Sequence, residues 1–417
     1  VFNPHSFPVK APAYIPYVSK SVCDDKGRPV PFQIVRAEKT NGSDKYETLI
    51  MADVPAFGWA THYVYRKNEI DKPAPSKVSA DEDTLENELV RIEFDKHTGW
   101  IKSYYDKEAK KELAQAPFAK PIVIRDDQPD TWSHNVFEFR EEIGAFTDAV
   151  LTVIEEGPVR AAIRVISTYN NSKLVQNFTL YAGTKELEVR CFLTFAEQLK
   201  IVKLSFPVSQ SNSKVTYSMP YGFITKPADG AEEPAHRWID ISDDSGAGLA
   251  LLNDCKYSFD VKGSDMRMAV ARGCGFADHY GFRDDRMQFQ DQGEQFFNYV
   301  LVPHDTADFA PVVKRAALLN QPLDLIRETH HEGPLGTRYE GIKISADNCV
   351  AEAVKQAEDG NGTILRLYET AGRQTAVKVE IPVLNVAFRA EFKPQEIKTY
   401  LIPDGSAEAR EVNFLEW

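Results

Sequence analysis

The sequence predicts an all-β protein built around a large β-sandwich. Between Gly157 and Pro207, three runs rich in Val, Ile, Leu, Phe and Thr alternate apolar and polar residues, with breaks at Asn170-Asn171 and Gly183. Such alternation is typical of half-buried antiparallel strands. No helical pattern nearby is strong enough to cover their apolar face, so a second sheet has to cover it.

The composition allows a sizeable core and disfavours two classes of partner. The chain has 417 residues, of which 43% are hydrophobic and 11% aromatic. Disorder is not expected at this composition, and the length suits several domains. Lys and Arg total 49 against 62 Asp and Glu, a net charge of −13. This charge repels phosphate backbones and anionic lipid, so we expect no nucleic-acid partner and no membrane partner.

Cysteine usage and the termini suggest a reduced environment and a piece of a longer protein. The five Cys are scattered and form no CxxC motif, which favours free thiols over disulfides or a zinc site. No apolar run approaches the length of a membrane span, and no signal peptide is visible at Val1. The chain starts without Met and within a motif, so we expect a fragment. A cytoplasmic, bacterial origin is expected.

Residues 1–75 are predicted to form a small N-terminal β-domain. Short strands are expected at 13–18, 31–37, 47–52 and 58–66, with turns at 24–27 and at Asn41-Gly42. The proline-containing segment 71–79 is typical of a linker.

Residues 76–319 are predicted to form the large sandwich, and residues 320–417 a small C-terminal β-sandwich. The run from Leu85, LENELVRIEFD, is expected to pair with WIKSYYDK as a hairpin. One convincing helix is expected at 305–319, where apolar residues recur at helical spacing. In the last domain CVAEAVKQ is interpreted as a strand, because a turn and another strand follow it.

The sequence contains no self-contained set of catalytic residues. Phosphate loops, nucleophile elbows and HExxH motifs are absent. His304 ends a strand and is interpreted as a hydrogen-bonded structural histidine. The adjacent pairs His330-His331, Asp126-Asp127, Asp243-Asp244 and Asp284-Asp285 are interpreted as loop or turn residues, because neighbours in a turn do not face each other across a substrate. No catalytic residue and no metal ligand is therefore assigned.

A set of aromatic and charged residues spread over several loops suits a sugar. Flat rings beside Arg and Asp can bind the apolar face and the hydroxyl rim of a pyranose. The alternative is that these rings pack in a β-core with their polar ends at its edge. The set is Trp132, Tyr217, Tyr221, Arg237, Trp238, Tyr257, Tyr280 and Tyr368.

Nine phrases, in order and spacing, resemble one known family over essentially the whole chain. They are VFNPHSFPV, DVPAFGWATHYV, NELVRIEFDKHTGWIKSYYDK, FAEQLKIVKLSFPV, PYGFITKP with HRWIDIS, GLALLNDCKYSFDV, FQDQGEQFFNYVLVPH, VKQAEDGNGTILRLYE and EIKTYLIP. This series is similar to the C-terminal β-domains of α-mannosidases of glycoside hydrolase family 38.

The resemblance implies a fold and an activity. The implied fold is all-β, with a large super-sandwich like that of galactose mutarotases between two smaller β-domains. The implied activity of the parent protein is retaining hydrolysis of α-mannosidic bonds. In that family an Asp nucleophile and the His and Asp ligands of a zinc ion lie in an N-terminal barrel, which a helical bundle follows. These residues have no counterpart here, so zinc is expected in the parent's catalytic domain and not in this chain.

The resemblance also implies two sugar contacts at the edge of the substrate pocket, for which this sequence offers three candidate residues. Some members place a Tyr on the strand before a Tyr-Gly or Asn-Gly turn, which matches Tyr217 of TYSMPYG. Others place an Arg on the strand that here reads ILRLYE. Tyr368 stands near that position, with Arg366 two residues earlier on the same face.

The expected function is that of a non-catalytic β-region that braces the catalytic barrel and walls the sugar cleft. Its expected partners are the N-terminal barrel and helical domain, an α-mannoside sugar and, through an exposed apolar patch, a further copy. One alternative is a stand-alone carbohydrate-binding module. The other is a mutarotase-like epimerase that uses His236, His279 or His304 with a carboxylate.

Overall fold

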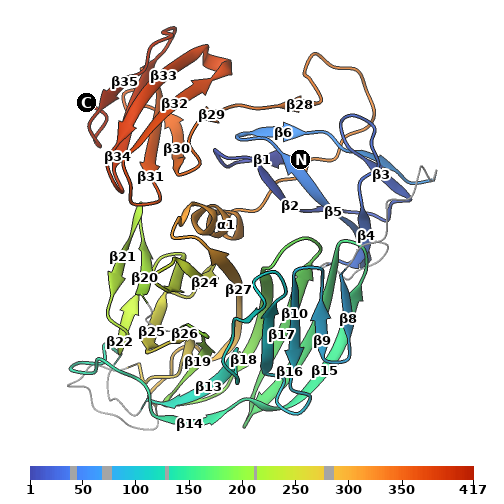
Figure 1. Cartoon of the computed structure of the whole chain (residues 1–417), viewed down its shortest axis with the longest axis vertical. Helices are drawn as coiled ribbons and strands as arrows, with labels where there is room; N and C mark the ends of the chain where they lie inside the picture. Colours follow the sequence, from blue (N-terminus) through green and yellow to red (C-terminus); the bar gives the residue numbers. More distant parts are fainter. Residues whose placement is uncertain (38–44, 68–77, 127–130, 211–213, 277–285) are drawn as a thin grey trace. The chain divides into compact units, whose positions relative to one another are not determined.

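The computed structural model describes residues 1–37, 45–67, 78–126, 131–210, 214–276 and 286–417, and these residues form an all-β fold (Figure 1). Among them one α-helix, α1 (Ala310–Asn320), and one 3₁₀ turn, η2 (Pro382–Leu384), interrupt the strands. The all-β prediction is confirmed. No helix in these ranges is long and apolar enough to span a bilayer.

The chain divides into two compact units. The first is built from both ends of the chain and the second from its middle. Unit 1 comprises Val1–Ser76, Pro220–Phe223 and Asp308–Trp417, and unit 2 comprises Lys77–Met219 and Ile224–Ala307. The division into domains 1–75, 76–319 and 320–417 stays a prediction.

Unit 2 is organised around a nine-stranded antiparallel sheet. Its order is β15 (Thr147–Glu156), β16 (Arg160–Tyr169), β17 (Ser172–Tyr181), β18 (Leu187–Phe195), β27 (Gly293–Asp305), β24 (Ala247–Asn253), β23 (Trp238–Ser242), β20 (Lys214–Met219) and β21 (Gly222–Lys226). β16 and β17 form a hairpin in which Tyr169 pairs with Ser172. Asn170 takes the left-handed conformation in its turn, where the sequence predicted a break.

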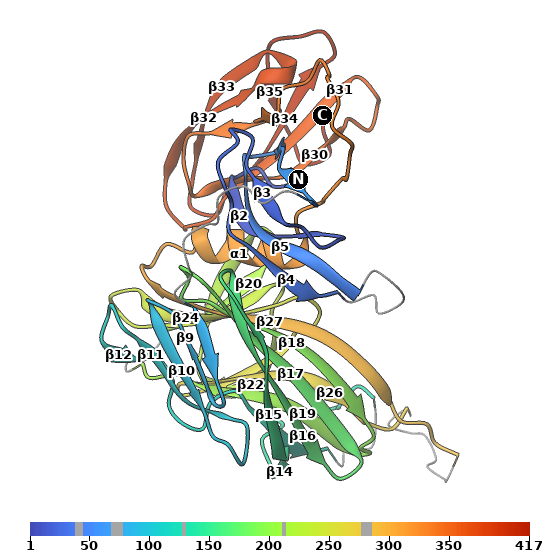
Figure 2. The ribbon, with the colours of Figure 1, turned by 90° about the vertical axis from the view of Figure 1, so that its right-hand side faces the viewer.

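Two smaller sheets face this long sheet. The first runs β14 (Glu142–Ala145), β13 (Lys120–Arg125), β19 (Lys200–Pro207), β26 (Asp265–Arg272), β25 (Ser258–Lys262) and β22 (Asp229–Pro234). The second runs β12 (Lys111–Glu112), β11 (Ile101–Asp106), β10 (Val90–Phe94), β9 (Thr84–Glu86) and β8 (Ser79–Asp81), beside the β15–β18 end of the long sheet (Figure 2).

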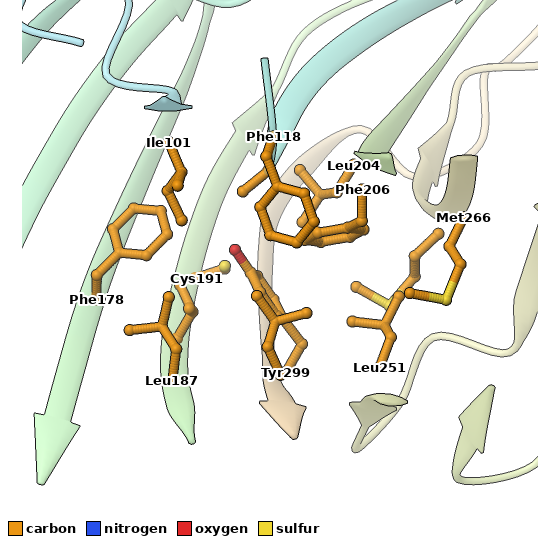
Figure 3. Packing of buried hydrophobic residues seen from close by; sticks show 14 of the residues in the cluster. Ile101, Phe118, Phe178, Leu187, Cys191, Leu204, Phe206, Leu251, Met266 and Tyr299 are labelled. Atoms are coloured by element: carbon orange, nitrogen blue, oxygen red, sulfur yellow. The ribbon is translucent and has the colours of Figure 1, made fainter. Parts of the chain in front are cut away.

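Buried aromatic rings join the two layers. Phe94 of β10 meets Phe178 of β17 edge to face at 4.9 Å, and Phe206 of β19 meets Tyr299 of β27 at 5.3 Å. Phe118 packs on Phe206 at 5.5 Å, and Figure 3 shows both rings over Tyr299 with Cys191 beside its hydroxyl. Each fully buried ring of this kind stabilises the fold by about 1.5–3 kcal/mol. The predicted large sandwich is confirmed.

Two predicted strand boundaries are wrong. The third run of the central stretch is two strands and not one. Its first part, β18, belongs to the nine-stranded sheet and ends at Phe195, and its second part, β19, belongs to the facing six-stranded sheet. The run from Leu85 likewise breaks into β9 and β10. Asn87 makes this break, because its carboxamide oxygen accepts the N–H groups of Leu89 and Val90 at 2.8 and 2.9 Å.

The described residues of unit 1 form five small antiparallel sheets. In strand order they are β1 (Phe2–Asn3), β6 (Gly58–Ala60) and β28 (Arg338–Tyr339); β2 (Val9–Ile15), β5 (Tyr46–Val54) and β4 (Phe32–Arg36); β3 (Ser21–Cys23) and β7 (Tyr63–Tyr65); β29 (Lys343–Ile344), β32 (Thr375–Ile381) and β33 (Val386–Phe392); and β30 (Cys349–Gln356), β31 (Gly362–Glu369), β34 (Ile397–Pro403) and β35 (Arg410–Val412). CVAEAVKQ is the strand β30, as predicted.

The first and last parts of the sequence share one core in unit 1. Val9 and Ile50 belong to the same buried cluster as Val350 and Tyr368. The hydroxyl of Ser6 also accepts the N–H of Ala351 at 2.8 Å. These contacts join segments more than 300 residues apart in the chain.

The helix begins five residues later than predicted. β27 continues to Asp305, and α1 starts at Ala310. The carboxylate of Asp308 accepts the N–H of Ala310 at 2.9 Å, and Pro311 occupies the first turn, where a missing N–H costs nothing.

Candidate functional site

Tyr217 lies in unit 2 on β20 and is 1% exposed. The ammonium group of Lys226 lies 5.4 Å from its ring centroid, and Lys226 is itself paired with Glu233. Burial, followed by the negative charges of Glu233, Asp229 and Glu232, raises the pKa of the Tyr217 phenol. The phenol is therefore neutral at physiological pH and offers a ligand very little surface.

Arg366 and Tyr368 lie in unit 1 on β31, on the same face as their spacing of two predicts. Their neighbours Leu365 and Leu367 point the other way, into the core of the C-terminal sandwich. The Nε of Arg366 donates to the hydroxyl of Thr399 on the adjacent strand at 3.1 Å. The strand pattern therefore separates one apolar face from one face that carries a guanidinium and a phenol.

The face of β31 with the guanidinium holds a cluster that we call the β31 aromatic cluster, made of Tyr221, Arg366, Tyr368 and Phe414. The ring of Tyr221 stands at 84° to that of Tyr368, with centroids 5.4 Å apart, and lies 6.5 Å from that of Phe414. The guanidinium carbon of Arg366 lies 4.0 Å from the Phe414 centroid, and its Nη2 donates to the Phe414 carbonyl at 3.1 Å. Cation–π stacking and edge-to-face contact hold the four side chains together.

A buried carboxylate anchors the end of β31. Glu369 is 0% exposed, and its two oxygens accept hydrogen bonds from five donors at 2.7–3.1 Å. The donors are the backbone N–H groups of Ala371, Gly372, Arg373 and Gln395 and the side-chain amide of Asn348. Because Glu369 follows Tyr368 directly, this anchor fixes the register at which Tyr368 enters the cluster.

The structure brings together two of the three predicted contact residues. Tyr368 and Arg366 share the β31 aromatic cluster, whereas Tyr217 belongs to the other unit. Their role as sugar contacts stays a prediction. Phe414 was not selected from the sequence, because nothing in the final run NFLEW distinguishes this ring from its apolar neighbours Leu415 and Trp417. It is 56% exposed and is the most open ring of the cluster.

The remaining aromatic residues do not form one platform. Trp132 and Tyr257 are 67% and 51% exposed, whereas Trp238 is 3% exposed and part of the interior. Tyr280 lies outside the described residues. For Trp238, the packing alternative is the one that the structure supports.

His304 forms a buried pair with Asp240 in unit 2. Its Nε2 lies 2.7 Å from Asp240 Oδ1, and its Nδ1 lies 2.9 Å from the carbonyl oxygen of Thr306. Both neighbours are acceptors, so the ring satisfies both only when both nitrogens carry a proton. Burial opposes the charged ring, but the hydrogen bond and charge of Asp240 outweigh it and raise the pKa of His304. His304 is hydrogen-bonded, as interpreted from the sequence.

In two of the acidic pairs one carboxylate is bound within the fold. Asp126 is buried and makes a two-pronged contact with Arg272, at 2.7 and 3.3 Å. Asp243 closes its turn by accepting the N–H of Ser245 at 2.8 Å. Asp127 and the Asp284-Asp285 pair lie outside the described residues.

A network of buried charges crosses the six-stranded sheet. The ammonium of Lys203, whose side chain is 0% exposed, lies 2.6 Å from Asp260 and also bonds Glu232. Asp260 accepts a further bond from Arg140. Burial lowers the pKa of Lys203, and the charge of Glu232 opposes this shift. Such pairing is what allows charges to remain in the interior.

The described residues do not fit a zinc ion. No group of three or more His, Cys, Asp or Glu within the described ranges could hold a metal. The His304–Asp240 pair supplies only two such side chains, and the second ring nitrogen of His304 already faces a backbone carbonyl. A catalytic zinc site takes three protein ligands.

Comparison with known proteins identifies the family. Residues 85–280 match the glycosyl hydrolases family 38 C-terminal domain, and residues 348–400 match the family 38 C-terminal beta sandwich domain. The chain carries the C-terminal domains of glycosyl hydrolase family 38. The first match covers β9 to β26 and leaves out β27, and the second covers β30 to the first part of β34, including Arg366 and Tyr368.

Curated relatives of this family 38 region are α-mannosidases. Alpha-mannosidase 2C1 of Homo sapiens is 31% identical over an aligned length of 307 residues, and the alignment covers 69% of this chain and 28% of that protein. Alpha-mannosidase G of Dictyostelium discoideum is 24% identical over an aligned length of 332 residues, and the alignment covers 73% of this chain and 29% of that protein. The chain thus spans less than a third of the length of these relatives.

Solved structures share the fold of the family 38 region. A family 38 glycosyl hydrolase from Enterococcus faecalis superposes with a TM-score of 0.77 at 15% identity, covering 95% of this chain and 56% of that one. An α-mannosidase from the same species gives 0.75 at 15% identity, covering 95% and 55%. At this identity the likeness concerns the fold.

Proposed function

We propose that the protein to which this region belongs is a retaining α-mannosidase and that the region itself is non-catalytic. The observation that carries the proposal is the family 38 match over residues 85–280, together with a relative named as an α-mannosidase at 31% identity. The region would brace the catalytic barrel and wall one side of the sugar cleft.

The state of the buried carboxylates supports a non-catalytic role. A retaining glycosidase needs two carboxyl groups about 5 Å apart that both reach the substrate. Asp260, Asp126 and Glu369 are each at most 1% exposed and are bound by Lys203, by Arg272 and by backbone N–H groups. Carboxylates bound in this way stabilise strands and turns.

The proposed sugar contacts of the region are Tyr217, Tyr368 and Arg366, and Arg366 comes first because Tyr217 and Tyr368 are only 1% and 6% exposed. The Arg366 side chain is 11% exposed and lies beside the exposed ring of Phe414. A guanidinium held by stacking is pre-organised to donate to sugar hydroxyls. Zinc and the nucleophile would be supplied by the catalytic domain of the full-length protein.

Hydrolysis of an aryl α-mannoside tests the proposal. The chain alone and the full-length protein are assayed side by side, with and without added zinc. We expect turnover from the full-length protein and none from the chain in either condition. Turnover by the chain alone would overturn the non-catalytic assignment, and an inactive full-length protein would overturn the α-mannosidase assignment.

A further inference from the structure

Five apolar residues form a straight row across the outer face of the nine-stranded sheet. They are direct cross-strand partners: Val150 with Ile166, Ile166 with Val175, Val175 with Phe192, and Phe192 with Phe296. The row crosses five neighbouring strands of unit 2, which lie side by side in Figure 1: β15, β16, β17, β18 and β27. We call these five residues the apolar row.

The apolar row is open to solvent rather than part of the core. Val150 is 59% exposed and Phe296 is 68% exposed, and the three residues between them are partly exposed. The inward side chains of the same strands, such as Leu174 and Leu193, are fully buried in the sandwich. An outer sheet face is normally polar, so five apolar residues in register indicate a contact surface.

Polar rows flank the apolar row on both sides. On one side the cross-strand partners are Thr152, Arg164, Asn177, Arg190 and Asn298. On the other side they are Thr168, Lys173, Thr194 and Glu294. An apolar centre with a polar rim is the usual composition of a protein–protein interface.

The shape of the row favours a protein surface over a sugar. The rings of Phe192 and Phe296 lie 4.6 Å apart at 54°, so they present no common plane on which a pyranose could stack. The other three residues are β-branched, and such side chains interdigitate when one sheet packs on another.

The charges favour a second copy in one orientation. If a twofold axis ran along the strands through Val175, Arg164 of each copy would face Arg190 of the other. If the axis ran along the row, Arg190 would face Thr194, and Asn298 would face Glu294. The second arrangement opposes no like charges, and it stacks Phe296 on Phe296.

We propose that the apolar row is a homodimer interface in which two copies pack their nine-stranded sheets face to face about a twofold axis along the row. Five strands at about 4.8 Å spacing and three rows cover roughly 500 Å² per copy. Stable dimers bury about 800 Å² per partner, so association is concentration-dependent and weak. Because each chain carries a charge of −13, salt that screens this repulsion strengthens the dimer.

Sedimentation equilibrium tests the interface in both the 417-residue chain and the full-length protein. We expect a monomer–dimer equilibrium in both, which Val175→Lys weakens at least tenfold because it places two lysines face to face at the centre. Ile224→Lys is the matched control, since Ile224 is β-branched, 47% exposed, on β21 and outside the row. It should leave the equilibrium unchanged.

Arg190→Glu tests the orientation. If the axis runs along the row, the new carboxylate faces Thr194, and the dimer dissociation constant should change less than threefold. If the dimer instead becomes much tighter, the carboxylate has paired with Arg164 of the other copy, and this orientation is overturned. A monomer at every concentration, or a dimer indifferent to Val175→Lys, overturns the proposal. A third result would also overturn the proposal: a chain that stays monomeric but binds an oligomannoside, with Val175→Lys abolishing that binding. The apolar row would then be a sugar-binding surface.

Discussion

His304 and Asp240 form a buried pair in which Nε2 lies 2.7 Å from Oδ1, while the other carboxylate oxygen has no hydrogen-bond partner among the described residues. The protonated ring of His304 therefore supplies most of the interaction that offsets the desolvation cost of the Asp240 carboxylate. Burial of an ion without its partner costs several kcal/mol, so the protonation state of His304 affects stability.

We expect the contribution of His304 to be greatest at acidic pH. Its pKa is raised in the folded protein, so the contribution is fully present below the unfolded value, near 6.5, and is lost as pH rises through the folded pKa. Urea denaturation of the unmodified chain and His304→Gln between pH 5.5 and 9 measures this. The difference between the two proteins should shrink as pH rises, and a constant difference would contradict the prediction. His331→Gln, at an exposed position, is the control.

Lys203→Met should destabilise unit 2 by about 3–5 kcal/mol, because it removes the ammonium group that pairs with the carboxylates of Asp260 and Glu232 in the interior. The midpoint of urea denaturation measures the loss. Lys96→Met breaks the exposed pair with Glu82 and should change stability by less than about 0.5 kcal/mol. Equal effects of the two substitutions would show that the buried network adds nothing.

Glu369→Gln should destabilise unit 1 by about 2–3 kcal/mol. An amide nitrogen in place of one carboxylate oxygen would face the backbone N–H of Gly372 or Ala371, and the charge-assisted hydrogen bonds would weaken. Thermal denaturation measures the change, with Glu391→Gln at an exposed position of β33 as the control. An unchanged melting temperature would mean that the anchor at the end of β31 is dispensable.

Arg366→Met in the full-length protein should raise KM for an α-mannoside about three- to tenfold, since one charged hydrogen bond to a sugar contributes about 1 kcal/mol or more. Arg389→Met, at an exposed position of β33 outside the β31 aromatic cluster, is the matched control. If Arg366→Met lowers only the melting temperature and leaves KM unchanged, Arg366 is a packing residue. Tyr217→Phe and Tyr368→Phe are tested in the same way.

Much of the fold could be predicted because its signals are local. Alternation along β16 and β17 shows which side chains face inward, and Asn170 adopts the turn conformation that its neighbours require. The order of the phrases around Tyr217 and Arg366 was sufficient to place the chain in its family. These features depend on residues within one strand or turn, or on similarity to other sequences.

The candidate site could be predicted only in part. The spacing of Arg366 and Tyr368 puts them on one face of a strand, and the structure confirms it. That Tyr221, almost 150 positions earlier, and Phe414 would join them could not be read from any local pattern. Contacts between segments so far apart depend on the packing of whole sheets.

The sequence by itself therefore determined the β-class, the strand faces and the family, because these follow from side-chain period and composition. Only the tertiary structure decided that β18 and β19 enter facing sheets, that Lys203 meets Asp260, and that five apolar residues line up from Val150 to Phe296. The reason is that a period of two tells which way a side chain points but not which strand lies beside it. Neighbours are chosen by long-range burial and pairing, and these act only when the sheets assemble.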